Sequence, residues 1–418
     1  MIRPLAAFEK YHIDIKAYVQ MALKVKNSDQ VLPTIQKLKK YALGLRTRVI
    51  DNEKLLVSEQ EVPIYSIPSG LGLKQACDYM SEKHTRPVSQ ALASIGTTGN
   101  TIVFHSCHLC ADGAFLQRLF NALKDESADI VPNAITPIGK TFEKHIKEAT
   151  LPPKFVTSDP RLSRVKTIDP LSLSNIDLTQ SYYLQTPLRA LKCSNSKGEI
   201  HRLTDSLWAQ LILTAAALNG TFNEKACSTC INLRPYLDQI HFGIGNAFSW
   251  LTVGAEADRN TTVSEFMNRL RYDFKNQVDT GLHFGYLKIV EEGLAKENNV
   301  KHIGPAVELS HVGRFKLNDT FSDVFINATL AAPKVLGLTS CLTFTVEDDY
   351  GRNDLISNFR YNAQELTLKD AQIINKTIIY GLQNVDFKMT CGDAIDMLAQ
   401  YAEKLKKENK EFPHWKVL

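Results

Sequence analysis

The run from Asn100 to Gly113 constrains the fold of this chain most strongly, because it predicts a strand, a short turn and a helix in direct succession. Residues 101–107 are rich in β-branched and aromatic side chains and lack proline and glycine, which is typical of a buried strand. Residues 114–124 carry apolar side chains at helical spacing, and Asp112 is placed to cap that helix. His108 therefore lies between two rigid elements, a position suited to a general base.

The length of the chain predicts two domains, because 418 residues exceed one ordinary domain. Apolar residues make up 44% of the sequence, which is normal for a protein with a substantial core. Strands and helices alternate in both halves, whereas residues 151–204 are interrupted by prolines and are weakly periodic. We predict a first α/β domain at 1–160, a crossover linker at 161–204 with a strand at 180–184, and a second domain at 205–418.

The charge and the apolar runs exclude several classes of partner. A net charge of +4 is mild, and the basic cluster at 404–410 is mixed with glutamates, so we expect no nucleic-acid partner. No apolar run approaches the roughly 20 residues that span a bilayer, so we predict no transmembrane segment. The charged first residues do not form a signal peptide, and the eight cysteines are scattered, which predicts reduced thiols in the cytoplasm.

Two Cys-x-x-Cys pairs, Cys107/Cys110 and Cys227/Cys230, could together supply four zinc ligands. They lie far apart in the sequence and lack the glycines and aromatic residues expected around a zinc ribbon. A redox role would require a thioredoxin-like setting, which the sequence does not offer. We interpret these cysteines as buried, inert thiols and predict no metal site.

Several short segments resemble a known family. His108 to Gly113 matches the His-x-x-x-Asp-Gly motif of the coenzyme A-dependent acyltransferase superfamily, which includes chloramphenicol acetyltransferase and peptide-synthetase condensation domains. Two segments resemble the fungal alcohol acetyltransferase branch, the branch that the chain resembles most closely: Arg3–Leu5 with Phe8–Tyr11, and Ser310–Phe315. Asn232–Arg234 with Phe242–Asn246 resembles the Asn-x-Arg and Gly-Asn pair of the superfamily's second domain, and all of these segments follow in the expected order. The resemblance covers nearly the whole chain.

Two positions depart from the pattern of the superfamily. Cys107 stands where many members have a second histidine, and Asp349–Asn353 differs from the Asp-Phe-Gly-Trp-Gly segment of the plant branch. We interpret Asp349–Asn353 as a hairpin turn. A role of this loop in binding coenzyme A is therefore not carried over from the plant enzymes.

The resemblance implies an α/β fold of two similar chloramphenicol acetyltransferase-like mixed-sheet domains with an active-site tunnel between them. It implies that His108 is the general base and that Asp112 turns away from the tunnel and holds the loop, with Arg234 or Arg314 as its partner. The remaining implied residues bind substrate or coenzyme A (Gly113, Ser310, Gly313) or support the site (Arg234, Asn246, Arg314).

By the same resemblance, the chain is an acyltransferase that moves an acetyl or other acyl group from acetyl-CoA to the hydroxyl or amine of a small or lipid-like acceptor. Transfer is direct within a ternary complex, so acyl-CoA is a co-substrate and no cofactor is permanently bound. Condensation-type or longer-chain transfer, and a non-catalytic acyl-CoA-binding protein, are the alternatives. We expect a monomer. The acceptor, the acyl chain length and peripheral attachment to endoplasmic reticulum or lipid droplets stay open.

Overall fold

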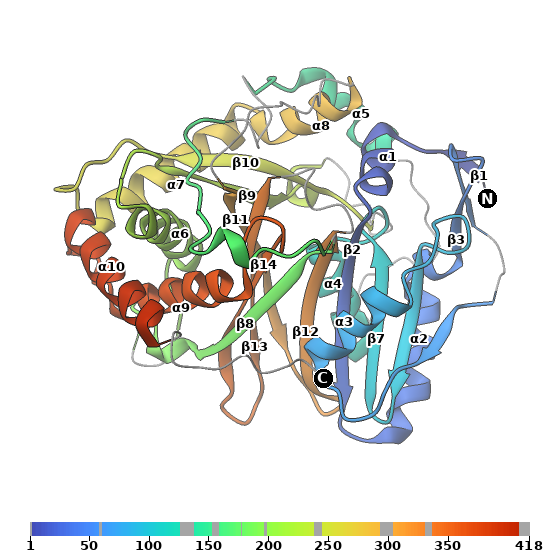
Figure 1. Cartoon of the computed structure of the whole chain (residues 1–418). Helices are drawn as coiled ribbons and strands as arrows, with labels where there is room; N and C mark the ends of the chain where they lie inside the picture. The colour runs from blue at the N-terminus through green and yellow to red at the C-terminus, as the bar shows by residue number, and fades with distance from the viewer. Residues whose placement is uncertain are drawn as a thin grey trace.

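Two mixed β-sheets with flanking helices form the body of the protein (Figure 1). The computed structural model describes residues 2–57, 61–125, 138–152, 159–176, 178–195, 199–237, 245–292, 304–330 and 337–408. A smaller three-stranded sheet lies beside them, in the order β1 (Ile2–Pro4), β4 (Lys54–Val57) and β3 (Thr47–Ile50). The two mixed sheets confirm the predicted fold class.

The five-stranded sheet carries the strand that precedes His108. Its strands are, in spatial order, β12 (Phe321–Leu330), β2 (Ala17–Val25), β7 (Thr101–Cys107), β6 (Ala93–Thr98) and β5 (Ile64–Ser66). Three helices pack around it: α2 (Val31–Tyr41), α3 (Leu73–Lys83) and α4 (Gly113–Lys124). The core between them includes the fully buried Met21, Leu38, Phe104 and Phe120. Burying each such side chain contributes about 1.5–3 kcal/mol.

The six-stranded sheet is the core of the other half. Its strands are, in spatial order, β10 (Phe248–Gly254), β9 (Ala226–Asn232), β11 (Ala306–Lys316), β13 (Leu338–Glu347), β14 (Asn353–Tyr361) and β8 (Gln180–Pro187). It is covered by α6 (Leu203–Asn219), α7 (Val263–Asp279), α9 (Leu368–Asn384) and α10 (Cys391–Glu408) (Figure 1). Helix α6 is buried on nearly all sides, and it ends at Gly220, whose φ of 71° needs no Cβ.

One strand of the second half belongs to the sheet of the first half. β12 pairs antiparallel with β2, with Ile326 opposite Met21, and in Figure 1 the orange strand lies beside the dark blue one. β12 was not predicted. β8 confirms the strand expected at 180–184 and extends it, as the edge of the six-stranded sheet. The domain limits at 160 and 204 stay a prediction.

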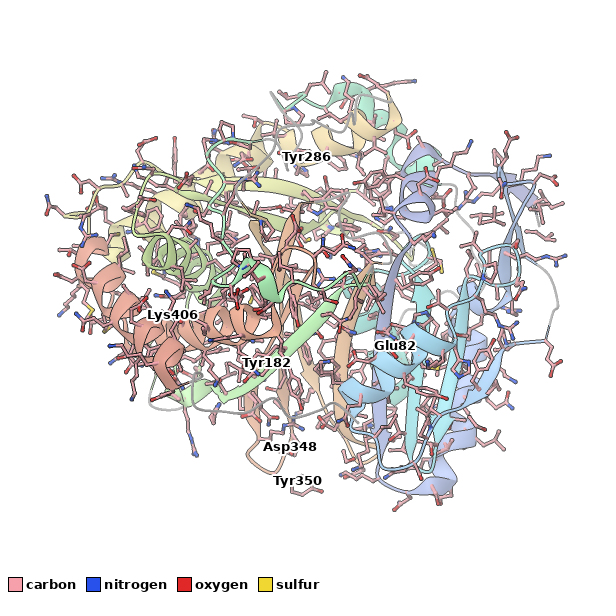
Figure 2. The ribbon with its side chains drawn as sticks, viewed as in Figure 1. Glu82, Tyr182, Tyr286, Asp348, Tyr350 and Lys406 are labelled. Atoms are coloured by element: carbon pink, nitrogen blue, oxygen red, sulfur yellow. The ribbon has the colours of Figure 1, made fainter. Side chains whose placement is uncertain are left out.

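The turn expected at Asp349–Asn353 joins β13 to β14 as a hairpin. The amide of Asp348 donates to the carbonyl of Arg352 at 3.0 Å, and Tyr350 is exposed. Asp348 and Tyr350 lie at the lower tip of the molecule (Figure 2). In the same half, β9 ends at Asn232 and a 3-10 turn follows at Arg234–Tyr236.

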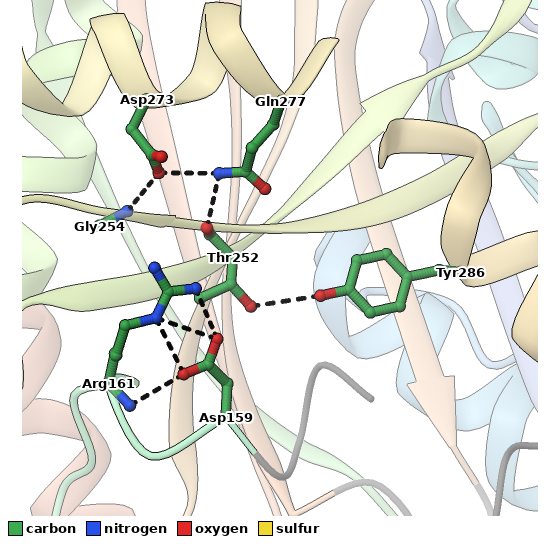
Figure 3. A network of polar contacts seen from close by, with 7 residues as sticks. All are labelled: Asp159, Arg161, Thr252, Gly254, Asp273, Gln277 and Tyr286. Carbon is green, nitrogen blue, oxygen red and sulfur yellow. Dashed lines mark hydrogen bonds and ion pairs between the residues drawn. The ribbon is translucent and has the colours of Figure 1, made fainter. Parts of the chain in front are cut away.

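A polar network fixes helix α7 to the back of β10 (Figure 3). The side chain of Gln277 donates to the carbonyl of Thr252 at 2.8 Å and to Asp273 at 2.7 Å. Asp273 in turn accepts from the amide of Gly254 at 3.0 Å. These contacts satisfy buried polar groups, so we regard the network as structural.

Three further helices lie at the edge where the halves meet: α1 (Ala7–Asp14), α5 (Ile138–Glu148) and α8 (Gly285–Glu291). α8 contacts both α1 and α5. Within the described ranges, every helix is too short or too polar to cross a bilayer.

Candidate active site

His108 lies directly after β7, in a turn that is held from both sides. Its amide donates to the carbonyl of Ala17 at 2.8 Å, and its carbonyl accepts from the Asn246 side chain at 2.6 Å. Asp112 caps α4, because one of its oxygens accepts from the amide of Phe115 at 2.7 Å. The predicted strand, turn and helix are all present, and the cap is the one expected.

The other oxygen of Asp112 joins the two halves of the chain. It accepts from Nη1 of Arg234 at 2.9 Å and from the amide of Ala247 at 2.6 Å. The side chains of Asp112 and Arg234 are each 3% exposed. Of the two arginines considered, Arg234 is therefore the partner of Asp112, whereas Arg314 is 68% exposed and pairs with Glu347.

Three glycines permit close approach around this turn. A Cβ on Gly113 would lie 2.9 Å from a methyl of Val312, and Gly313 has a φ of 110° beside a β-bulge in β11. A Cβ on Gly245 would overlap the backbone carbonyl of Cys110. His241 to Ile244, the first part of the glycine-rich segment in the second half, lies outside the described residues.

Replacing Gly245 with alanine is expected to destabilise the protein by about 1–3 kcal/mol or more, because neither backbone can yield without moving the His108 turn. Urea unfolding measures the change. Gly72→Ala is the matched control, since a Cβ there meets only the flexible end of Gln75, at 3.2 Å. Equal stability of the two variants would contradict the close contact.

A cavity of about 880 Å³, its mouth included, lies between the two sheets. The five-stranded half contributes His108, Gly113 and Leu116, and the six-stranded half contributes Ser310 and Phe248. The expected site between the halves is thus present as a cavity, and its two separate entrances stay a prediction. Gly313, Arg234, Asn246 and Arg314 do not line it.

Burial lowers the pKa of His108 to about 4, while nearby Asp112 and the residue's own carbonyl counteract part of this change. The imidazole is therefore neutral at physiological pH, the form that accepts a proton. Its ring centre is 4.8 Å from that of Phe248, which forms an apolar wall beside it.

A second histidine, His12 of α1, reaches the same cavity and was not predicted. Its ring centre lies 5.0 Å from that of His108. Nδ1 of His12 donates to the carbonyl of Phe8 at 2.8 Å, since a carbonyl can only accept, so Nε2 carries the lone pair. Burial lowers the pKa of His12 to about 3, with His108 adding to the effect. No local signal marks a lone histidine on a helix as part of a site.

A buried ion pair was also missed. Glu308 of β11 and Arg360 of β14 line the cavity, 3.7 Å apart, and Trp250 donates its indole N–H to Glu308 at 3.1 Å. A signal for this pair was present in the sequence, because charged residues inside otherwise apolar strands are rarely buried without a partner or a role.

The cysteines of the two Cys-x-x-Cys pairs lie in or beside β7 and β9. Cys110 contacts the carbonyl of Cys107 and the hydroxyl of Ser106, and burial raises the pKa of the Cys107 thiol to about 11. Within the ranges that the structure describes, no group of three or more histidine, cysteine or acidic residues is arranged to hold a metal ion.

No protein-family model matches the sequence, and no curated protein matches it either. Solved structures do match. A variant of the starter condensation domain of rhizomide synthetase RzmA in complex with C8-CoA has a TM-score of 0.58 at 13% identity, over 94% of this chain and 97% of that one. Polyketide synthase associated protein 5 from Mycobacterium tuberculosis has a TM-score of 0.57 at 12% identity, over 96% and 97%.

A second RzmA starter condensation domain variant, in complex with C8-CoA and Leu-SNAC, has a TM-score of 0.57 at 13% identity, over 93% of this chain and 96% of that one. Identities this low establish the fold alone. These structures support the superfamily's fold and do not single out the fungal alcohol acetyltransferase branch. The chain has the two-sheet fold of the condensation domains and of polyketide synthase associated protein 5.

Proposed function

We propose that this protein transfers an acyl group from an acyl-CoA thioester to the hydroxyl or amine of an acceptor, with His108 as the general base. The observation that carries the proposal is a neutral imidazole lining a cavity between two sheets, at the end of a strand and before a capped helix. The fold shared with RzmA starter condensation domains in complex with C8-CoA supports the choice of thioester.

The chemistry follows from the geometry of the His108 ring. Nδ1 is buried, and we propose Nε2 as the nitrogen that meets a ligand in the cavity. It takes a proton from the acceptor, whose oxygen or nitrogen then attacks the thioester carbonyl, and the coenzyme A thiolate leaves with that proton. Ser310 lines the cavity, and we propose that its hydroxyl donates to the oxyanion. Asp112 fixes the turn and takes no proton itself.

Neutral His12 contributes to the surroundings of the base in this proposal. Its Nδ1 donates to the carbonyl of Phe8, and burial lowers its pKa, so it remains neutral beside the base. Together with Phe248 and Trp250 it encloses one side of the imidazole and excludes water from it. Excluding water also limits hydrolysis of the thioester.

The acyl chain length and the acceptor class define the two candidate functions. Acetyl transfer to an alcohol or amine is the first. Condensation-type transfer of a longer acyl chain is the second, and the RzmA complex that contains both C8-CoA and Leu-SNAC favours it. Incubation with acetyl-, octanoyl- and palmitoyl-CoA and a panel of alcohols, amines and aminoacyl thioesters, followed by mass spectrometry, separates them.

Free coenzyme A is expected in these incubations only when an acceptor is present. Acyl-CoA binding without release of coenzyme A would instead indicate a non-catalytic binding protein. Release at equal rates with and without acceptor would indicate a hydrolase.

The pH dependence of transfer should reflect the lowered pKa of His108. With an alcohol acceptor, kcat/KM is expected to be flat above about pH 6 and to fall only as pH approaches about 4. A folded-state pKa below the ordinary 6.5 also means that the unfolded chain binds protons first, so stability declines as pH falls from 6.5 towards 4. Circular dichroism at each pH is the control. A half-point near 6.5 in a folded sample would contradict the buried imidazole.

A further inference from the structure

A polar row crosses the cavity wall on three neighbouring strands. Glu308 of β11 lies opposite Ser340 of β13, and Ser340 lies opposite Arg360 of β14. Directly paired residues project to the same face of a sheet, and all three line the cavity. The general-base mechanism uses none of them. Among the described residues of the cavity wall, Glu308 and Arg360 are also the ones that carry a permanent charge.

The hydrogen bonds of this row are incomplete. Nη1 of Arg360 donates to the carbonyl of Ala328 at 3.1 Å, but Nε is buried without a partner, and Nη2 is 3.7 Å from Glu308, beyond hydrogen-bond distance. The Ser340 hydroxyl is buried without a partner. Trp250 and Cys230 bond to the Glu308 carboxylate, which can accept about four hydrogen bonds in all.

Such a row is costly in the absence of a ligand. A buried donor without an acceptor destabilises the folded state, and a buried ion pair is favourable only when its remaining groups are satisfied. The row therefore offers open donors from Arg360 and open acceptor sites on Glu308, side by side and facing the cavity.

The pairing of donor and acceptor selects the ligand group. A carboxylate only accepts and would be repelled by Glu308, whereas an ammonium only donates and would be repelled by Arg360. A hydroxyl both accepts and donates through one oxygen. Bridging the pair from the cavity side, it can accept from Arg360 and donate to Glu308, with Ser340 of the intervening strand beside it.

We propose that the acceptor substrate carries a second hydroxyl, held between Glu308 and Arg360 while its first hydroxyl or its amine meets His108. The preferred acceptors are thus diols or amino alcohols with an apolar remainder. This inference rests on the proposed acyl transfer and adds the class of acceptor to it. Glu308, Ser340 and Arg360 act as binding and positioning groups, not as catalytic ones.

The test compares octanol with a vicinal octanediol as acceptors for the same acyl-CoA. The protein is expected to prefer the diol about 10- to 100-fold in kcat/KM, the effect of a hydrogen bond to charged groups. Ser340→Ala removes a hydroxyl that has no protein partner, so it should not prevent folding. Glu308→Gln keeps the shape of the side chain but removes the counter-ion of Arg360, so circular dichroism first establishes that this variant is folded. Both should lower the preference, whereas Glu347→Gln, a carboxylate outside the cavity, should retain it.

Equal kcat/KM for the two acceptors, or a preference that both variants retain, would overturn the inference. If Glu308→Gln raises KM for acyl-CoA but leaves the preference for the diol unchanged, the polar row binds coenzyme A. That result would also overturn the inference. If no acceptor releases coenzyme A, the proposed function fails. In that case, calorimetric titration with the diol and with octanol tests the polar row alone. The diol is expected to bind more tightly than octanol. Equal affinity for the two would overturn the inference.

Discussion

Replacing His108 with alanine is expected to lower kcat for acyl transfer about 10²–10⁴-fold, the usual contribution of a general base. The variant loses the nitrogen that takes the acceptor's proton, but it keeps the cavity that brings thioester and acceptor together. Its KM for acyl-CoA should therefore change little, and a small residual rate should persist. Release of coenzyme A, followed with a thiol reagent, gives both constants.

A second imidazole variant controls for the loss of a histidine outside the cavity. His84 stacks on Tyr65 and is not among the residues that line the cavity, so His84→Ala should keep its turnover. Circular dichroism establishes that both variants are folded. A folded His108→Ala protein with full turnover would remove His108 from the mechanism and leave the cavity without its proposed base.

Replacing Arg234 with alanine is expected to destabilise the protein by about 3–5 kcal/mol, because it leaves the buried carboxylate of Asp112 without its counter-ion. The same carboxylate caps α4 and bonds to Ala247, so the His108 turn should lose its fixed geometry as well. Guanidinium unfolding measures the first effect, and kcat under conditions where the variant is folded measures the second.

Arg314→Ala provides the comparison for this variant. Its side chain is 68% exposed and pairs with Glu347 near the surface, so its removal should cost about 0–1 kcal/mol. If the two arginine variants unfold at the same denaturant concentration, the pair between Asp112 and Arg234 does not hold the two halves together as described.

The sequence predicted those parts of the site that depend on local order. Strand β7, the turn at His108 and helix α4 follow from side-chain periodicity and a capping residue, all within fourteen residues of chain. The hairpin of β13 and β14 was also predicted, because its turn residues stand between two apolar runs.

The parts that were missed depend on contacts between distant residues. Nothing local to residues 321–330 indicates that β12 pairs with β2 at the start of the chain. Helical spacing does not place His12 beside His108, and the choice between two arginines for Asp112 depends on how the halves pack. Glu308 and Arg360 could have been marked as unusual within their strands, but their alignment through Ser340 requires the strand register.

The central claim is that the cavity between the two sheets is where a thioester meets the His108 imidazole. A crystal structure with a non-reactive thioether analogue of acyl-CoA tests it most directly. We predict that the thioether sulfur and the adjoining carbon lie in the cavity beside Nε2 of His108, with space left for an acceptor. Coenzyme A bound elsewhere on the protein, with the His108 side of the cavity closed to it, would contradict the account.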